Sequence, residues 1–241
     1  MRQMRIADSK YATLRGKYMP PDARETSADR FDRIYATIRE RICLLHYPPG
    51  TVLNEAGLAA EFKVSRTPLR RVLQRLSFEE LLVITNGVGT IVSDIDMKTF
   101  KDIYKLRILL ADAMGDMSPG TISPKHIAAV DELIARAESL SAEQDVEQYA
   151  ILANELQAII KNLIGSAPLR DVTDVLYYRV ARIWFTFLPS LDWREVCADQ
   201  LNELIELREA MVQNDMRVFG QIRSRKLRGI LGRISLYLSD G

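Results

Sequence analysis

The segment from Val64 to Leu76, VSRTPLRRVLQRL, constrains the fold more than any other stretch of the 241-residue chain. Ser65 can cap a helix, and Pro68 falls in its first turn, where a missing amide costs little. Apolar side chains then recur at spacings of three and four, which predicts a helix with one buried face, made by Leu69, Val72, Leu73 and Leu76. The opposite face carries groups that can bind phosphates or the acceptor edge of guanine, namely Arg66, Arg70, Arg71, Gln74 and Arg75.

The flanking residues complete a helix-turn-helix with a β-wing. Upstream, we expect a first helix over roughly residues 31–45, then a short second helix and a tight turn over residues 53–63. Downstream, residues 81–85 and 90–92 predict two short strands joined by a glycine turn. A module of this kind docks its recognition helix in the major groove, so the sequence predicts binding to double-stranded DNA.

These motifs resemble the amino-terminal domain of the GntR family of bacterial transcription regulators. That family combines a PG turn, an L-x-E-x-x-LA helix, a VSRTPxR recognition helix and a glycine wing. The equivalents in this chain are Pro49-Gly50, Leu53 to Ala59, Val64 to Arg70 and Gly89. The resemblance covers roughly residues 30–92, and it implies a winged DNA-binding domain of that type.

The resemblance also implies roles for individual residues at DNA. Arg66 and Arg70 are the expected base or phosphate contacts, and Ser65 and Thr67 position the recognition helix on the backbone. The wing glycines allow a close approach to the minor groove. The predicted DNA-binding residues are Ser65, Arg66, Thr67, Arg70, Arg71, Gln74, Gly87 and Gly89.

Charge divides the chain in the same way. Residues 30–92 hold 9 basic and 6 acidic side chains, whereas residues 93–241 hold 18 basic and 22 acidic ones. The positive excess therefore lies in the predicted DNA-binding part, as phosphate contacts from one face require. Residues 1–29 are expected to form a flexible extension, residues 30–93 the winged helix-turn-helix domain, and residues 94–99 a linker.

Other classes of protein fit the sequence poorly. The two cysteines, Cys43 and Cys197, lie in separate predicted domains, so we expect no disulfide framework. The amino terminus lacks the apolar core of a secretion signal, and no apolar run is long enough to cross a membrane. No nucleophile has a histidine partner at a catalytic spacing, and there is no phosphate-binding glycine loop. We therefore expect a cytoplasmic protein that is not an enzyme.

Residues 100–241 predict an all-α antiparallel helical bundle. Apolar residues at helical spacing extend over residues 100–117, 124–139, 146–164, 169–187, 193–213 and 215–238. The predicted fold class is mostly α, with an N-terminal winged helix-turn-helix that carries a small β-wing and a C-terminal bundle of about six helices.

This second half resembles the FCD domain of the FadR branch of the same family, a ligand-sensing domain. The resemblance rests on Tyr104 to Arg107, Gly165 to Leu169 and Ala210 to Asp215. Many members hold a divalent metal with one aspartate and three histidines. The matching positions in this chain hold Ala153, Gln157, Leu204 and Lys226. We therefore expect no metal and no other cofactor.

Family members generally sense small organic acids, so a pocket without a metal needs cationic or amide donors for a carboxylate effector. Arg107 matches a pocket arginine of the family, while Gln157 and Lys226 occupy lost ligand positions. The predicted effector-binding residues are Arg107, Gln157, Arg179 and Lys226, with Arg182 as a further anion contact and Tyr177, Tyr178 or Trp184 as walls.

Two alternatives stay open. Lys226 lies in the basic run from Arg223 to Arg228, where a solvated face would also explain it. Large side chains such as Phe185 or Phe187 could also fill the pocket, which would leave a ligand-free dimeric DNA-binding protein. An open polar cavity would favour the sensor instead.

Together these features predict a homodimeric transcription regulator, a repressor, that binds a short inverted repeat of double-stranded DNA. A small-molecule effector in the helical domain would change the relative placement of the two DNA-reading heads. Ligand binding and DNA binding would then be coupled reciprocally.

Overall fold

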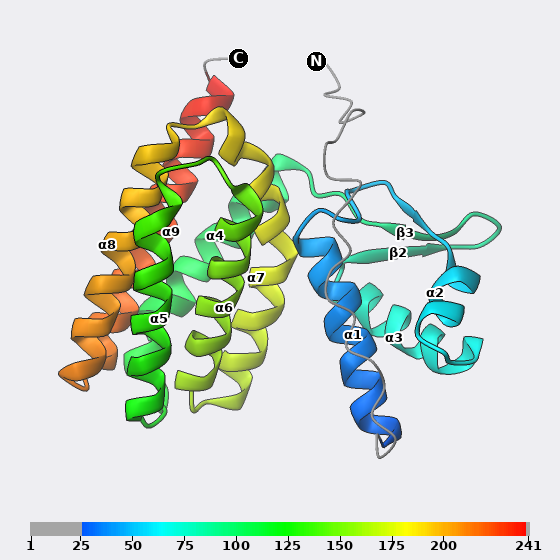
Figure 1. Ribbon diagram of the computed structural model, residues 1–241, viewed down its shortest axis with the longest axis horizontal. Helices are drawn as coiled ribbons and strands as arrows, with labels where there is room; N and C mark the ends of the chain where they lie inside the picture. Colours follow the sequence, from blue (N-terminus) through cyan, green and yellow to red (C-terminus); the bar gives the residue numbers. More distant parts are fainter. Residues whose placement is uncertain (1–25, 240–241) are drawn as a thin grey trace. The chain divides into compact units, whose positions relative to one another are not determined.

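The computed structural model describes residues 26–239, whose fold divides into two units between Asp94 and Ile95 (Figure 1). Most of the expected extension, residues 1–25, lies outside the described residues. Helix α1 (Ser27–Cys43) begins inside the range expected for that extension. It begins there because Thr26 and Asp29 form a capping box, in which the amide of each residue donates to the side chain of the other at 3.0 and 3.1 Å.

The first unit is a winged helix-turn-helix, as predicted. After α1 come β1 (Val52–Leu53), α2 (Glu55–Glu61), α3 (Arg66–Phe78), β2 (Leu82–Thr85) and β3 (Gly89–Val92). Strand β3 lies in the centre of the sheet and pairs antiparallel with both neighbours. Strand β1 was not predicted, because its two residues are too few to show an alternating pattern. This strand ties the chain before α2 to the wing.

Helices α1 and α3 pack through apolar faces that are almost completely buried. The predicted inward face of α3 is confirmed, because each of its four apolar residues is at most 1% exposed. Burying one such side chain stabilises the fold by roughly 1.5 to 3 kcal/mol. The facing residues are Ile34, Ile38 and Ile42 of α1 and Leu69, Val72, Leu73 and Leu76 of α3.

The second unit consists of six α-helices in its described part, which confirms the predicted helical bundle. They are α4 (Met97–Asp112), α5 (Pro124–Leu140), α6 (Val146–Leu163), α7 (Ala167–Phe187), α8 (Trp193–Val212) and α9 (Met216–Ser239), with short 3-10 turns at Ala113–Gly115 and Leu188–Ser190. Helix α4 begins within the range expected for the linker because the Asp96 side chain caps it, accepting from the Thr99 amide at 2.9 Å. None of the helices within residues 26–239 is long and apolar enough to span a bilayer.

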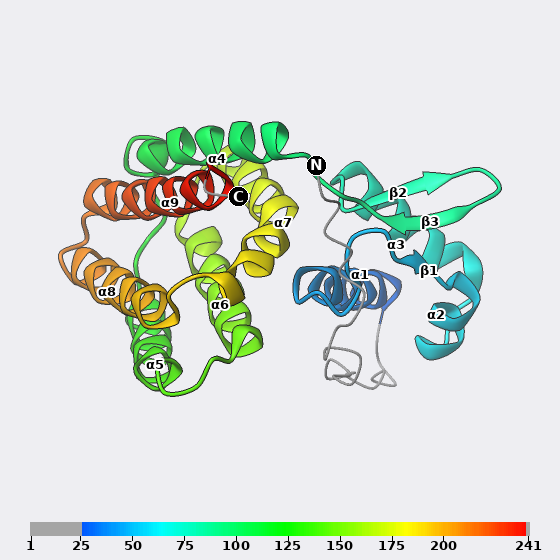
Figure 2. The same ribbon diagram turned by 90° about the horizontal axis from the view of Figure 1, so that it is seen from above.

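The six helices form a closed ring. In the order α4, α9, α8, α5, α6 and α7, each helix packs on the next, and α7 packs back on α4. Figure 2 shows this arrangement with α4 beside α9 and α5 beside α8. A ring of this kind encloses an interior that several helices share, and the side chains directed into it decide whether it is a packed core or a cavity.

Helices α4 and α9 come into close contact at a glycine. A Cβ atom built on Gly220 of α9 would lie 2.4 Å from the carbonyl oxygen of Ala111 in α4. Atoms do not approach to this distance, and a backbone carbonyl cannot rotate away as a flexible side chain can. Only glycine at this position permits the observed spacing of the two helices.

We predict that Gly220→Ala lowers the free energy of unfolding, although alanine normally stabilises a helix interior by about 0.5 to 1 kcal/mol relative to glycine. The clash with Ala111 outweighs that gain. Gly232→Ala, in the same helix with open space around its Cβ position, is the matched control and should be stabilising. Urea denaturation of the two variants measures both effects, and equal stabilisation by both would contradict the close contact.

Candidate functional site

The exposed face of α3 presents the side chains expected to contact DNA. Arg66, Thr67, Arg70, Arg71 and Gln74 are all exposed, and the apolar face of the helix lies against the core. These groups therefore lie on one accessible surface of the first unit. Their contact with DNA stays a prediction.

Ser65 stands at the N-cap of α3, as expected, with extended φ and ψ values of −73° and 168°. Its hydroxyl, however, makes no capping hydrogen bond to the helix. Ser65 therefore occupies the predicted N-cap position without the side-chain hydrogen bond that usually stabilises a helix there. The residue is exposed, which leaves the hydroxyl available to another acceptor or donor such as a DNA phosphate.

Arg75 has a different role from the other cations of α3. Its guanidinium lies over the Tyr35 ring, 4.4 Å from the ring centroid, and its Nε is 3.1 Å from a carboxylate oxygen of Glu79. The Tyr35 hydroxyl donates to the same carboxylate at 2.6 Å. Burial raises the pKa of Tyr35, so the hydroxyl stays protonated. Arg75 thus holds α1 against α3 and belongs to the packing of the unit.

Glu55, at the start of α2, joins three elements of the DNA-binding unit. One carboxylate oxygen accepts a hydrogen bond of 2.8 Å from the hydroxyl of Thr90 in β3. The other lies 3.3 Å from Nε of Arg70 in α3. Thr90 is only 1% exposed, so its hydroxyl depends on this acceptor. Glu55 therefore orients Arg70 and fastens the wing, a role that its place in the L-x-E motif did not disclose.

The wing turn requires glycine at two positions. Gly87 has φ +77° and Gly89 has φ +117°, in the left-handed region that other residues rarely adopt. Gly87 is exposed at the tip and Gly89 begins β3. The predicted glycine turn is therefore present, and its backbone is accessible for a close approach to DNA.

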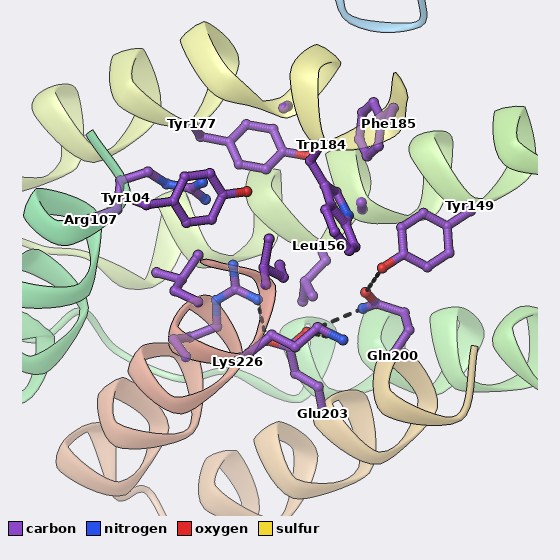
Figure 3. A pocket seen from close by; sticks show the side chains of 15 residues that line it. Tyr104, Arg107, Tyr149, Leu156, Tyr177, Trp184, Phe185, Gln200, Glu203 and Lys226 are labelled. Carbon is purple, nitrogen blue, oxygen red and sulfur yellow. Dashed lines mark hydrogen bonds and ion pairs between the residues drawn. The ribbon is translucent and has the colours of Figure 1, made fainter. Parts of the chain in front are cut away.

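A small cavity of about 40 Å³ lies inside the helical ring. Figure 3 shows Arg107 and Tyr104 on one side of it, Trp184 and Tyr177 above, and Glu203 and Lys226 below. Its walls come from every helix of the ring except α5. The residues that line it are Tyr104, Arg107, Tyr149, Ala153, Leu156, Tyr177, Ala181, Trp184, Phe185, Gln200, Glu203, Arg223, Lys226, Leu227 and Ile230.

Arg107 is a buried cation without a carboxylate partner among the described residues. It is 6% exposed, and its guanidinium lies 4.9 Å from the Tyr104 ring centroid and 5.3 Å from that of Tyr177. Burial lowers the pKa of Arg107, and the positive charge of Arg223 lowers it further. Aromatic faces attract a guanidinium, but they do not neutralise its charge.

The opposite wall of the cavity holds a hydrogen-bonded network around one carboxylate. Glu203, 4% exposed, accepts a hydrogen bond from Arg223 and lies 3.9 Å from Nζ of Lys226. The Gln200 amide donates to Glu203 at 3.4 Å, and the Tyr149 hydroxyl donates to Gln200 at 3.0 Å. Burial lowers the pKa of Lys226, which the nearby Glu203 partly opposes.

The charges around the cavity do not balance. Its described lining contains three cationic side chains, those of Arg107, Arg223 and Lys226, and one carboxylate, that of Glu203. An uncompensated buried charge costs several kcal/mol or shifts its pKa. The lining is therefore suited to an anion, which would supply the missing negative charge.

Two of the four predicted effector residues do not line this cavity. Gln157 is 2% exposed with its Nε2 unbonded, and Arg179 is half-buried, but neither is part of the lining. The reason is helical phase, because one residue turns the side chain by about 100°. On α6 the cavity stripe runs through Tyr149, Ala153 and Leu156, so Gln157 falls beside it.

On α7 the cavity stripe runs through Tyr177, Ala181 and Trp184, so Arg179 falls off it, as do Arg182 and Tyr178. The other two predicted residues, Arg107 and Lys226, do line the cavity. Four polar residues of the lining were not predicted, namely Tyr149, Gln200, Glu203 and Arg223. Gln200 and Glu203 could have been predicted, because they are polar residues three apart on an otherwise apolar face of a helix.

The donor set does not fit the divalent metal that the family resemblance would suggest. Of the matched positions, only Ala153 and Lys226 line the cavity, and neither is a metal ligand of the expected kind. The lining offers one carboxylate and no histidine, and cations surround it. Within residues 26–239 no group of three or more His, Cys, Asp or Glu side chains could hold a metal ion.

A winged helix-turn-helix joined to a helical ring with a charged interior defines a DNA-binding protein with a separate helical ligand domain. Residues 31–92 match the family model of bacterial regulatory proteins, gntR family, and residues 102–214 match that of the FCD domain. The chain therefore carries a DNA-binding domain of the GntR family and an FCD domain, as its resemblances suggested.

Known relatives are similar in sequence to part of this chain. The Nta operon transcriptional regulator of Aminobacter aminovorans is 37% identical over 95 residues, which are 39% of this chain and 45% of that protein. The gluconate operon transcriptional repressor of Bacillus subtilis (strain 168) is 36% identical over 78 residues, 32% of each chain. The matched part of this chain thus spans less than half the length of these relatives.

Solved structures share the whole fold. E. coli McbR/YncC aligns with a TM-score of 0.69 at 16% identity, over 88% of this chain and 99% of that chain. A GntR structure from Rhodococcus sp. RHA1 aligns with a TM-score of 0.65 at 20% identity, over 85% of this chain and 97% of that one. At these identities the likeness concerns the fold alone.

We predict that Glu55→Ala destabilises the protein by about 1 to 3 kcal/mol, because the buried Thr90 hydroxyl loses its acceptor. Glu55→Gln keeps an oxygen at that position and should recover most of the loss, although it weakens the contact with Arg70. Chemical denaturation of the full chain measures both variants. An equal loss in both would show that charge, rather than the hydrogen bond to Thr90, carries the effect.

Proposed function

We propose that this chain is a transcription regulator, acting as a repressor, which binds DNA with its first unit and a small organic anion, without a metal, with its second. The observation that carries the proposal is the excess of two positive charges around the interior cavity of the helical ring. A protein that needed this interior only for stability would gain from apolar residues there. The proposal is that binding the anion changes the affinity for DNA.

On the DNA side, Arg66 and Arg70 contact bases or phosphates, while Arg71 and Gln74 extend the same face. Ser65 and Thr67 bind the backbone beside the helix, and the turn with Gly87 and Gly89 approaches the minor groove. Two copies of the chain bind a short inverted repeat, with recognition helices about one helical turn apart. The likeness to the gluconate operon repressor supports repression as the mode of action.

On the ligand side, Arg107 and the pair of Arg223 and Lys226 lie on opposite walls, with Glu203 offsetting one of the charges. A carboxylate between these walls would receive charge-assisted hydrogen bonds from guanidinium groups, which suit it geometrically. Tyr104 and Tyr177 hold Arg107 from the sides, so it is oriented before the ligand arrives.

A second candidate is a regulator whose interior is packed shut and binds nothing. The small volume of about 40 Å³ favours it, as does the position of Trp184 and Phe185 in the lining. By the volume that one water occupies, this space holds roughly three water molecules. Phe187, in contrast, packs edge-on against Tyr237 and does not fill the cavity.

A thermal-shift titration with small carboxylates separates the two candidates. We expect the wild type to be stabilised, by about 2.7 kcal/mol when the ligand is at 100 times its dissociation constant. Arg107→Met should abolish this response while leaving the unliganded protein no less stable, because it removes an uncompensated buried charge. Arg208 of α8 forms an exposed ion pair with Asp131 of α5, so Arg208→Met is the control and should respond normally.

Absence of a response to every carboxylate in the wild type would favour the packed interior. An unchanged response in Arg107→Met would remove Arg107 from the ligand site.

Arg66→Ala should weaken binding to a selected operator by about 1 to 3 kcal/mol and relax the sequence preference, if this residue reads a base. The operator is first obtained by selection from random duplexes with the purified protein. Fluorescence anisotropy at fixed salt then compares the variant with Arg136→Ala, an exposed arginine of α5 in the helical unit. Equal losses by Arg66→Ala on operator and random DNA would make Arg66 a phosphate contact instead.

A further inference from the structure

A solvent-open groove of about 310 Å³ runs along α8 and α9 on the outside of the helical ring. It shares two lining residues, Glu203 and Lys226, with the interior cavity. These two side chains therefore form the partition between the cavity and the groove. The groove is much larger than the cavity, and nothing in the function proposed above uses it.

Ion pairs fasten the two helices at both ends of the groove and leave its middle open. Arg225 of α9 pairs with Glu206 of α8, and Arg233 pairs with Asp199. The register of these pairs places Asn202 of α8 opposite Gly229 of α9, between them. A Cβ atom on Gly229 would meet nothing within 4 Å, so this level has no side chain from α9.

The two side chains of the partition, Glu203 and Lys226, differ in how firmly their neighbours hold them. Arg223 donates a hydrogen bond to Glu203, whereas Nζ of Lys226 lies 3.9 Å from the same carboxylate, beyond hydrogen-bonding distance. Lys226 can therefore turn away while Glu203 keeps its partner. Its long flexible side chain can rotate toward the groove, where its ammonium is hydrated again.

We propose that the groove is the outer half of the ligand site, which rests on the function proposed above. The ligand is an organic monoanion longer than the interior cavity. Its carboxylate lies between Arg107 and Arg223, its chain passes the place that Lys226 vacates, and its uncharged polar end lies at Asn202.

Charge balance selects this class of ligand. With Lys226 turned into the groove, the cavity retains Arg107, Arg223 and Glu203, so a single carboxylate neutralises it. In the groove, Arg225 and Arg233 are already paired with carboxylates, and the turned Lys226 ammonium is hydrated, so the ligand needs no second charge. The exposed Asn202 amide, which makes no hydrogen bond within residues 26–239, suits a hydroxyl or an amide.

The connection between groove and cavity can be tested with iodide, a small anion that quenches tryptophan fluorescence on contact. Trp184 lines the cavity, and the other of the two tryptophans, Trp193, is replaced by phenylalanine to give a single reporter. Gly229→Phe fills the middle of the groove, and Gly232→Phe adds the same side chain at another open position of α9 outside the groove lining.

We expect iodide to quench Trp184 in the parent, which is the Trp193→Phe protein, and in its Gly232→Phe variant. In its Gly229→Phe variant, iodide should no longer quench Trp184. Equal quenching in the two variants would overturn the proposal, and so would a parent whose Trp184 is not quenched at all. Should Trp193→Phe fail to fold, the same pair of variants is compared with both tryptophans present, where the Trp184 component is the difference between them.

Occupation of the groove is tested with acetate and 6-hydroxyhexanoate as probes in thermal-shift titrations. Gly229→Phe slows entry of both probes, but at equilibrium it should weaken binding of the longer probe at least about tenfold and change the affinity for acetate much less, while Gly232→Phe alters neither. Equal affinities of the longer probe for the two variants would overturn the proposal that the groove is part of the ligand site, and would leave the proposed function standing. A parent that responds to neither probe, nor to other carboxylates, would overturn the proposed function and this inference with it, whatever the iodide result.

Discussion

The close packing of α4 on α9 is the constraint on which the helical unit depends. Because Gly220 lets the backbones approach, Arg107 of α4 and Arg223 of α9 face one small interior. The positive charge of Arg223 is close enough to lower the pKa of Arg107. A wider spacing would admit more water and screen these charges. Glu203 offsets only one of three cations, so the geometry that makes the ring compact also makes its interior receptive to an anion.

The fold was predictable from the sequence because its signals are local. Prolines, capping residues and helical spacing of apolar residues placed α5, α6 and α8 at their first residues, Pro124, Val146 and Trp193. Strand β1 was not predictable, since a two-residue strand exists only through its pairing with β3. The early starts of α1 and α4 come from caps at Thr26 and Asp96 that the apolar pattern does not include.

The cavity was only half predictable, for a geometric reason. Helix α7 is buried on most of its circumference, so burial alone cannot tell which of its residues face the interior and which face α4 or α6. Arg107 and Lys226 were found by matching them to a family pattern. Gln157 and Arg179 do not line the cavity because a shift of one or two positions along a helix turns a side chain out of a small space. Glu203 and Arg223 form a pair between helices, which a single helix pattern does not contain.

In the DNA-binding unit, as in the cavity, a single carboxylate lies beside an arginine that is predicted to bind an anion. Glu55 lies beside Arg70, a predicted DNA contact, but this exposed pair contributes little to stability, because water screens it. Arg70 can therefore exchange Glu55 for a phosphate at small cost. The bond from Thr90 to Glu55 is buried at its donor and stays in place during such an exchange. The wing thus keeps its attachment to α2 whether or not Arg70 binds DNA.

For ligand binding to change DNA binding, the ligand must have different affinities for two states of the protein. A ligand that binds both states equally does not shift the equilibrium between them. Moving a two-state equilibrium from 1:99 to 99:1 takes about 5.5 kcal/mol of such difference. Neutralising a buried charge is one of the few local events of that magnitude. Arg107 lies on α4, and only Ser93, Asp94 and Ile95 separate the end of β3 from the Asp96 cap of that helix. An anion that held α4 and α9 in the arrangement where Arg107 and Arg223 converge would therefore act on α4, the helix that follows the wing in the chain.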